Sequence, residues 1–99
     1  MNKKIKLGAY SESFGPRVVA MEILKDSLAS LDREDVEKLI FDLTEVKKLS
    51  TGYSKELFGG LWKNLGNDFP NRILFKFGEN KNILVSSILL GIEAEKTNL

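Results

Sequence analysis

Three groups of residues in the chain could do chemistry. The turn Ser50 to Gly52 brings two hydroxyls to the start of a predicted helix, and the turn Ser11 to Arg17 brings serines, a glycine and a guanidinium to the start of another. Asp42 lies near the end of an apolar run that reads as a buried strand. Free N–H groups at a helix start stabilise an anion by about 0.3 to 1 kcal/mol in exposed settings. Both turns could therefore hold a phosphate.

Each of these residues also has a purely structural interpretation. Ser50 and Thr51 belong to the residue types preferred as N-caps; alternatively, one exposed hydroxyl accepts a phosphoryl group and gains roughly two negative charges. Asp42 either accepts hydrogen bonds from the following loop or is a catalytic carboxylate. Arg17 is unfavourably placed for the helix dipole, so it holds an anion or pairs with a surface acid such as Glu12. The sequence leaves these alternatives open.

Histidine and cysteine are absent from the chain. Their absence removes disulfides, the usual zinc ligands, thiol nucleophiles and imidazole acid/base chemistry. The glycine-containing segments SFGPR and STGYS match neither a P-loop nor a dinucleotide fingerprint. We therefore expect a protein that is not an enzyme and that carries no cofactor and no metal.

Charge and length restrict the function further. A formal net charge of +1 provides no basic field for nucleic acid. The N-terminal stretch lacks an apolar segment of signal-peptide length, and the apolar segment Ile83–Ile92 is shorter than the roughly 20 residues that cross a bilayer. We expect a cytoplasmic protein without a membrane span, with residues 1–99 forming one domain.

The hydrophobic pattern alternates between strand and helix periods. It predicts a β-α-β-α-β-α order, which favours a small, mainly parallel sheet with helices mainly on one face. Gly59 and Gly60 inside the second helix each cost about 1 kcal/mol relative to alanine, so a close approach to the sheet or a bend is expected there. The expected elements are a strand at Lys4–Tyr10, a helix from Pro16 to Leu31, a strand at Leu39–Leu43, a helix at Thr51–Leu65, a strand at Arg72–Phe77, and a helix that begins after Asn80 or Asn82 and runs towards Lys96.

Two surfaces of this predicted fold suggest a function. Ligands of parallel α/β sheets gather outside the carboxyl ends of the strands, where the loops 11–17, 44–52 and 78–82 should meet. The helix segment Ile83–Ile92, ILVSSILLGI, is apolar on nearly every side, more than one sheet face needs to bury. The apolar side chains that the sheet cannot bury predict a partner surface or a homodimer contact.

The segments FDLTEV and LSTGYSKELF together resemble the STAS domains, and more closely the STAS-like group of bacterial proteins. The segment FGPR, followed by apolar spacing, also looks like the arginine-led first helix of that group, and the resemblance extends to the tail from Asn80. It implies a STAS-like fold and a non-catalytic regulatory role. STAS-type anti-sigma-factor antagonists bind a serine kinase of the GHKL-type ATPase fold and are switched off by phosphorylation in an Asp-Ser-[Ser/Thr]-Gly turn.

In this chain the corresponding turn is Leu49-Ser50-Thr51-Gly52. Ser50 matches the phospho-acceptor if the loop is one residue shorter, and Thr51 matches it without a gap. The preceding acid of the antagonists is replaced by Leu49 in the first alignment and by Ser50 in the second.

The leading hypothesis is a regulatory interaction module that docks a protein partner, a GHKL-type ATPase or serine kinase, through the edge 44–58. Phosphorylation of Ser50 or Thr51 is a candidate switch. The alternative is a sensor of a small anionic ligand or nucleotide that uses Arg17 and the two helix starts. The candidate residues for binding a partner or an anion are Arg17, Asp42, Gly52, Tyr53 and Ser54.

Overall fold

A small parallel sheet and the helices packed on it form the structure. The computed structural model describes residues 1–7, 13–14 and 17–97, without the side chains at positions 13, 14 and 17. The strands are β1 (Asn2–Lys6), β2 (Ser13–Phe14), β3 (Lys38–Leu43), β4 (Lys48–Leu49) and β5 (Ile73–Phe77). The helical segments are α1 (Arg17–Leu31), α2 (Thr51–Ser54), the π-helix η2 (Lys55–Gly59), α3 (Gly60–Leu65), the 3-10 turn η3 (Gly66–Asp68), α4 (Phe69–Arg72) and α5 (Lys81–Thr97).

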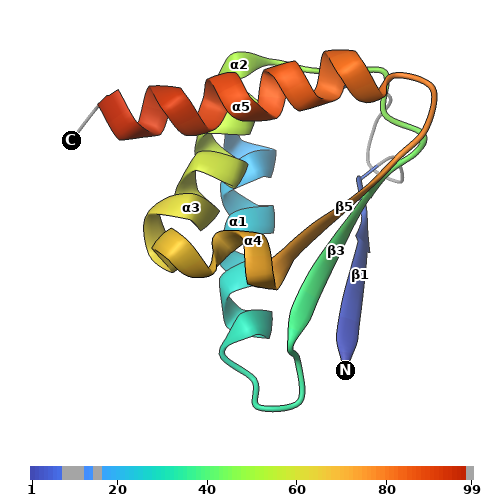
Figure 1. Ribbon diagram of the computed structural model, residues 1–99. Helices are drawn as coiled ribbons and strands as arrows, with labels where there is room; N and C mark the ends of the chain where they lie inside the picture. The colour runs from blue at the N-terminus through green and yellow to red at the C-terminus, as the bar shows by residue number, and fades with distance from the viewer. Residues whose placement is uncertain (8–12, 15–16, 98–99) are drawn as a thin grey trace.

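The main sheet has three parallel strands in the order β1-β3-β5. Its register aligns Ile5 with Phe41 and Phe41 with Phe75. Because side chains alternate across a strand, these aligned positions share one face of the sheet. The helices lie on that face, as Figure 1 shows. The prediction of a mixed α/β fold with a small parallel sheet is confirmed.

An aromatic cluster fills the space between the sheet and the helices. The ring of Phe58 lies 5.3 Å from the rings of both Phe41 and Phe75, in edge-to-face geometry. Leu39, Phe41 and Leu43 of the central strand are fully buried. The prediction of a buried strand at Leu39–Leu43 is therefore confirmed, and its apolar side faces the core.

The predicted helix Thr51–Leu65 is continuous, but its middle turn is a π-helix. A Cβ placed on Gly59 would lie 2.9 Å from Cβ of Glu95, and one on Gly60 would lie 2.7 Å from Cδ2 of Leu24. The expected close approach to the sheet is therefore wrong, because these glycines approach helices α5 and α1. Gly66 ends the helix with a φ of 56°, a left-handed conformation that glycine adopts without strain.

Several boundaries differ from the prediction. The first strand runs from Asn2 to Lys6, whereas it was expected at Lys4–Tyr10, and residues 8–10 lie outside the described part. The two-residue strands β2 and β4 pair in parallel and were not predicted, because two residues carry no period. On α1, Ser27 is fully buried, and its hydroxyl donates to the carbonyl of Ile23 at 2.6 Å.

In the part of the chain that the structure describes, no helix combines the length and the apolar character that crossing a membrane requires.

Candidate functional site

The loops at the carboxyl end of the sheet converge. A Cβ placed on Gly78, directly after β5, would lie 2.7 Å from the carbonyl oxygen of Thr44, directly after β3. The pairing of Ser13 with Lys48 and of Phe14 with Leu49 brings the segment before α1 beside the loop 44–50. The predicted meeting of loops from three parts of the chain is therefore confirmed for the described residues.

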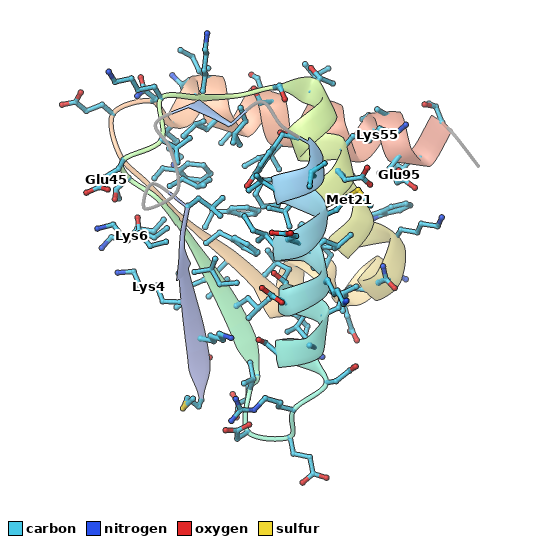
Figure 2. All side chains as sticks on the ribbon, turned by 180° about the vertical axis from the view of Figure 1, so that it is seen from behind. Lys4, Lys6, Met21, Glu45, Lys55 and Glu95 are labelled. Atoms are coloured by element: carbon cyan, nitrogen blue, oxygen red, sulfur yellow. The ribbon has the colours of Figure 1, made fainter. Side chains whose placement is uncertain are left out.

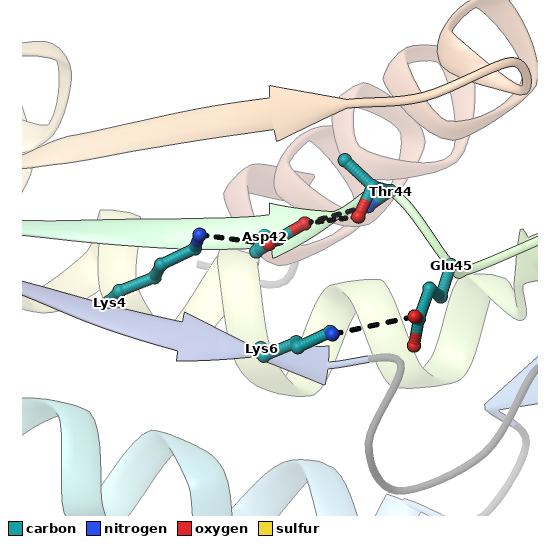
Figure 3. A network of polar contacts seen from close by, with 5 residues as sticks. All are labelled: Lys4, Lys6, Asp42, Thr44 and Glu45. Atoms are coloured by element: carbon teal, nitrogen blue, oxygen red, sulfur yellow. Dashed lines mark hydrogen bonds and ion pairs between the residues drawn. The ribbon is translucent and has the colours of Figure 1, made fainter.

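Asp42 fixes the start of the loop 44–50. Its Oδ1 accepts hydrogen bonds from the backbone N–H of Thr44 at 3.0 Å and from the hydroxyl of Thr44 at 2.6 Å. Its Oδ2 lies 3.3 Å from Nζ of Lys4 (Figure 3). The hydrogen bonds from Thr44 lower the pKa of Asp42 from 3.8 to about 2, with Lys4 contributing, despite the opposing effect of burial. Asp42 is therefore an ionised structural carboxylate that accepts hydrogen bonds from the following loop, as one of its two interpretations expected.

Thr44 and Gly78 are the residues of this edge that the sequence analysis missed. The spacing Asp42-Leu43-Thr44 could have predicted the role of Thr44, because an aspartate side chain commonly accepts a hydrogen bond from the backbone N–H two residues further on. For Gly78 no local signal exists, because the reason for a glycine there is the backbone of Thr44, which is distant in sequence.

The side of the sheet that faces away from the helices is charged. Lys4 and Lys6 of β1 lie on this side together with Glu45, as Figure 2 shows. Lys6 Nζ lies 3.4 Å from a carboxylate oxygen of Glu45, and both side chains are more than half exposed. Such an exposed ion pair contributes little to stability. Lys47 and Lys48 are also exposed, so the edge presents both signs of charge to solvent.

Ser50 is the N-cap of the helix that begins at Thr51. Its backbone is extended, and its Oγ accepts a hydrogen bond from the backbone N–H of Tyr53 at 3.1 Å. Thr51 is exposed, and its hydroxyl makes no hydrogen bond within the described residues. Gly52 is half-buried in the first turn. The capping role of Ser50 is therefore present in the structure, whereas Thr51 is exposed and its hydroxyl makes no hydrogen bond to a described residue.

The structure corrects the interpretation of Tyr53 and Ser54 as surface-binding residues. Both are fully buried, Tyr53 in the hydrophobic core and Ser54 against α5. A Cβ placed on Gly91 of α5 would lie 2.6 Å from Cβ of Ser54, so the two helices are in contact here. The hydroxyl of Ser54 has no hydrogen-bond partner in the described structure. Neither side chain is available to a partner at the surface.

The remaining candidate, Arg17, is the first residue of α1, and its side chain lies outside the described residues. Within the residues that are described, no group of three or more acidic side chains is placed to hold a metal ion. The loops at the carboxyl end of the sheet thus carry hydroxyls, a structural carboxylate and exposed charges.

The fold and the edge define a small α/β protein with hydroxyls and charged side chains exposed outside the carboxyl ends of its parallel sheet. Comparison of the chain with protein-family models, with curated proteins and with solved structures finds no match.

Proposed function

We propose that this chain is a non-catalytic regulatory module that docks a protein partner through the docking edge, defined as residues 44–52. The observation that carries the proposal is the exposure of Ser50 and Thr51 at a helix start that the Ser50 hydroxyl caps, at the end of a loop whose beginning Asp42 and Thr44 fix. The edge is narrower than the range 44–58, because Tyr53, Ser54, Leu57 and Phe58 are buried. The resemblance to STAS-like proteins supplies the partner class, a GHKL-type ATPase or serine kinase.

A fixed edge is suited to docking because little order remains to be imposed when a partner binds. The Asp42 carboxylate anchors one end of the loop through Thr44, and the Ser50 hydroxyl caps the helix at its other end. Between these anchors Val46 is buried, whereas Lys47 and Lys48 are exposed. Charges at the rim of an interface chiefly set the association rate and the choice of partner.

Phosphorylation of Thr51 is the switch that this geometry supports. The Thr51 hydroxyl is exposed and lies in the first helical turn, where the free N–H groups and the helix dipole stabilise a phosphoryl group. The Ser50 hydroxyl already serves as the cap. The added charge of roughly −2 would change the electrostatic match between the docking edge and its partner.

Phosphorylation is tested by incubating the protein and its variants with a purified GHKL-type serine kinase and ATP, followed by intact-mass measurement. We expect the wild type to gain one phosphoryl group and Thr51→Ala to gain none. Ser50→Ala should still gain one, while its unfolding free energy falls by about 1 kcal/mol because the cap is lost. A gain that persists in Thr51→Ala and disappears in Ser50→Ala would overturn the assignment to Thr51.

Docking is tested separately by a binding titration with the same kinase in the absence of ATP. Lys48→Glu changes an exposed charge of the docking edge, and Lys25→Glu makes the same change on the exposed side of α1. We expect the first variant to weaken binding at least about tenfold, equivalent to 1.4 kcal/mol, and the second to bind as the wild type does. Equal affinities for all three proteins would refute docking through this edge.

The alternative, a sensor of a small anion, depends on the guanidinium of Arg17. Because that side chain lies outside the described residues, no observation favours the sensor over docking.

A further inference from the structure

An apolar groove opens between β5 and α5. It has a volume of about 170 Å³, and every residue that lines it is apolar. The lining residues are Phe69, Phe75, Phe77, Val85, Ile88, Leu89 and Ile92. The groove therefore offers apolar surface that a partner can remove from water.

The groove leads directly into the aromatic cluster of the core. Phe75 contacts the rings of Phe41, Phe58, Phe69 and Phe77 at centroid distances of 6.1, 5.3, 6.5 and 5.7 Å. Phe75 nevertheless remains half-buried, as does Phe77. The core is therefore incompletely covered along β5, and a layer packed there would remove aromatic surface from water.

The strand beside this groove is an unprotected sheet edge. Within the described residues β5 pairs only with β3, so half of its backbone groups face away from the sheet. Edge strands that must not pair commonly carry lysines. The opposite edge strand, β1, has three of them in the segment NKKIK, whereas β5, with the segment ILFKF, has only Lys76. The lysines of β1 thus disfavour pairing at that edge of the sheet, whereas the β5 edge has only one such charge.

Helix α5 provides apolar side chains that could fill such a groove. Leu89 lines the groove and is 56% exposed, and the adjacent Leu90 is 59% exposed. A surface that contains both a hollow and protruding leucines beside it suits a two-fold contact, in which each copy fills the hollow of the other. A stable interface buries about 1,200 to 2,000 Å² of surface. Because pairing of the short strand β5 alone covers less than this, Leu89 and Leu90 would have to extend the contact.

We propose that a second copy of this chain covers the groove, with β5 paired antiparallel to the partner's β5 and Phe75 at the two-fold axis. This register places Leu74 opposite the partner's Lys76, so the only charge of the strand does not face its own copy. A two-fold axis normal to the sheet keeps both α5 helices on the same face, where their leucines meet. The contact lies outside the docking edge and does not depend on the function proposed for it.

The register is tested by light scattering and sedimentation of the full chain with matched changes at one exposed position. We expect the wild type to reach twice its mass of 11.1 kDa with increasing concentration. Leu74→Lys puts like charges opposite each other twice and should raise the dimer dissociation constant at least about tenfold, whereas Leu74→Glu should leave it unchanged or lower it. Met21→Lys, on the exposed side of α1 (Figure 2), is the control and should not change it.

Hydrogen exchange in the wild type gives a second readout. The backbone amides of Ile73–Phe77 that face away from β3 should exchange more slowly as dimer forms. A wild type that stays monomeric up to about 1 mM, where the association free energy would be weaker than about −4 kcal/mol, would overturn the proposal. A dimer that responds equally to Leu74→Lys and Leu74→Glu, with both variants folded by circular dichroism, would overturn the register and hence the β5 contact.

Discussion

Replacement of Asp42 by asparagine should destabilise the protein at neutral pH and flatten its response to acid. Asp42→Asn retains an oxygen that accepts from the Thr44 N–H, but it removes the negative charge opposite Lys4. The side chain of Asp42 is only 5% exposed but that of Lys4 is 52% exposed, so solvent screens the ion pair and the hydrogen bonds from Thr44 carry most of the effect. The pKa of Asp42 is about 2 in the folded protein, against an ordinary value of 3.8. One pKa unit corresponds to about 1.4 kcal/mol, so ionised Asp42 contributes roughly 2 kcal/mol at pH 7.

The sign of the pH dependence follows from the lowered pKa. Because the folded pKa lies below the unfolded value, the contribution of Asp42 is fully present above about pH 4 and is lost as the pH falls towards about 2. Urea denaturation of the wild type and of Asp42→Asn at several pH values across this window measures it. The difference between their unfolding free energies should be roughly 2 kcal/mol at pH 7 and should shrink towards zero near pH 2.

A control separates this effect from a general response to lost charge. Asp35 forms an exposed ion pair with Arg33 at 2.9 Å, and such pairs contribute about 0 to 1 kcal/mol. Asp35→Asn should therefore leave the unfolding free energy nearly unchanged over the same window. Equal stability of wild type and Asp42→Asn at pH 7, or parallel pH profiles for the two proteins, would refute the role assigned to Asp42.

Two further predictions concern the contact between α2 and α5. Gly91→Ala should lower the unfolding free energy by about 3 kcal/mol in thermal or urea unfolding, because its Cβ would lie 2.5 Å from the backbone carbon of Ser54. Gly60→Ala is the control, and its unfolding free energy should stay within about 1 kcal/mol of the wild-type value. At that position only the flexible side chain of Leu24 opposes the new methyl group, and alanine favours the helix. Equal losses in the two variants would contradict the close helix contact. Ser54→Ala should be as stable as wild type or up to about 1 kcal/mol more stable, because it removes a buried hydroxyl without a hydrogen-bond partner; a loss of stability would show that the hydroxyl has a structural role.

Much of the fold follows from local sequence signals. The alternation of Leu39, Phe41 and Leu43 predicted the buried face of β3, and Ser50 predicted the start of the second helix, because both signals act over a few residues. The π-turn at Lys55–Gly59 could not be read from the pattern, since one extra residue in a turn scarcely changes a period of 3.6.

The candidate site was predicted less well, for a physical reason. Tyr53 had the spacing of a core residue, in line with Leu57 and Leu61, and that spacing was the better guide to its position than its polar hydroxyl. Ser54 is buried because Gly91, distant in sequence, lets α5 approach its backbone. Burial at a helix crossing depends on both helices, so the sequence around Ser54 alone could not reveal it.

The central claim is that the accessible edge 44–52 meets a protein partner. Its most direct test is an amide chemical-shift map of the isotope-labelled chain, titrated with a purified GHKL-type serine kinase without ATP. The amides of residues 44–52, together with that of Gly78 beside Thr44, should shift or broaden first, while those of α1 stay in place. Shifts confined to the groove between β5 and α5, or no shifts at saturating kinase, would contradict it.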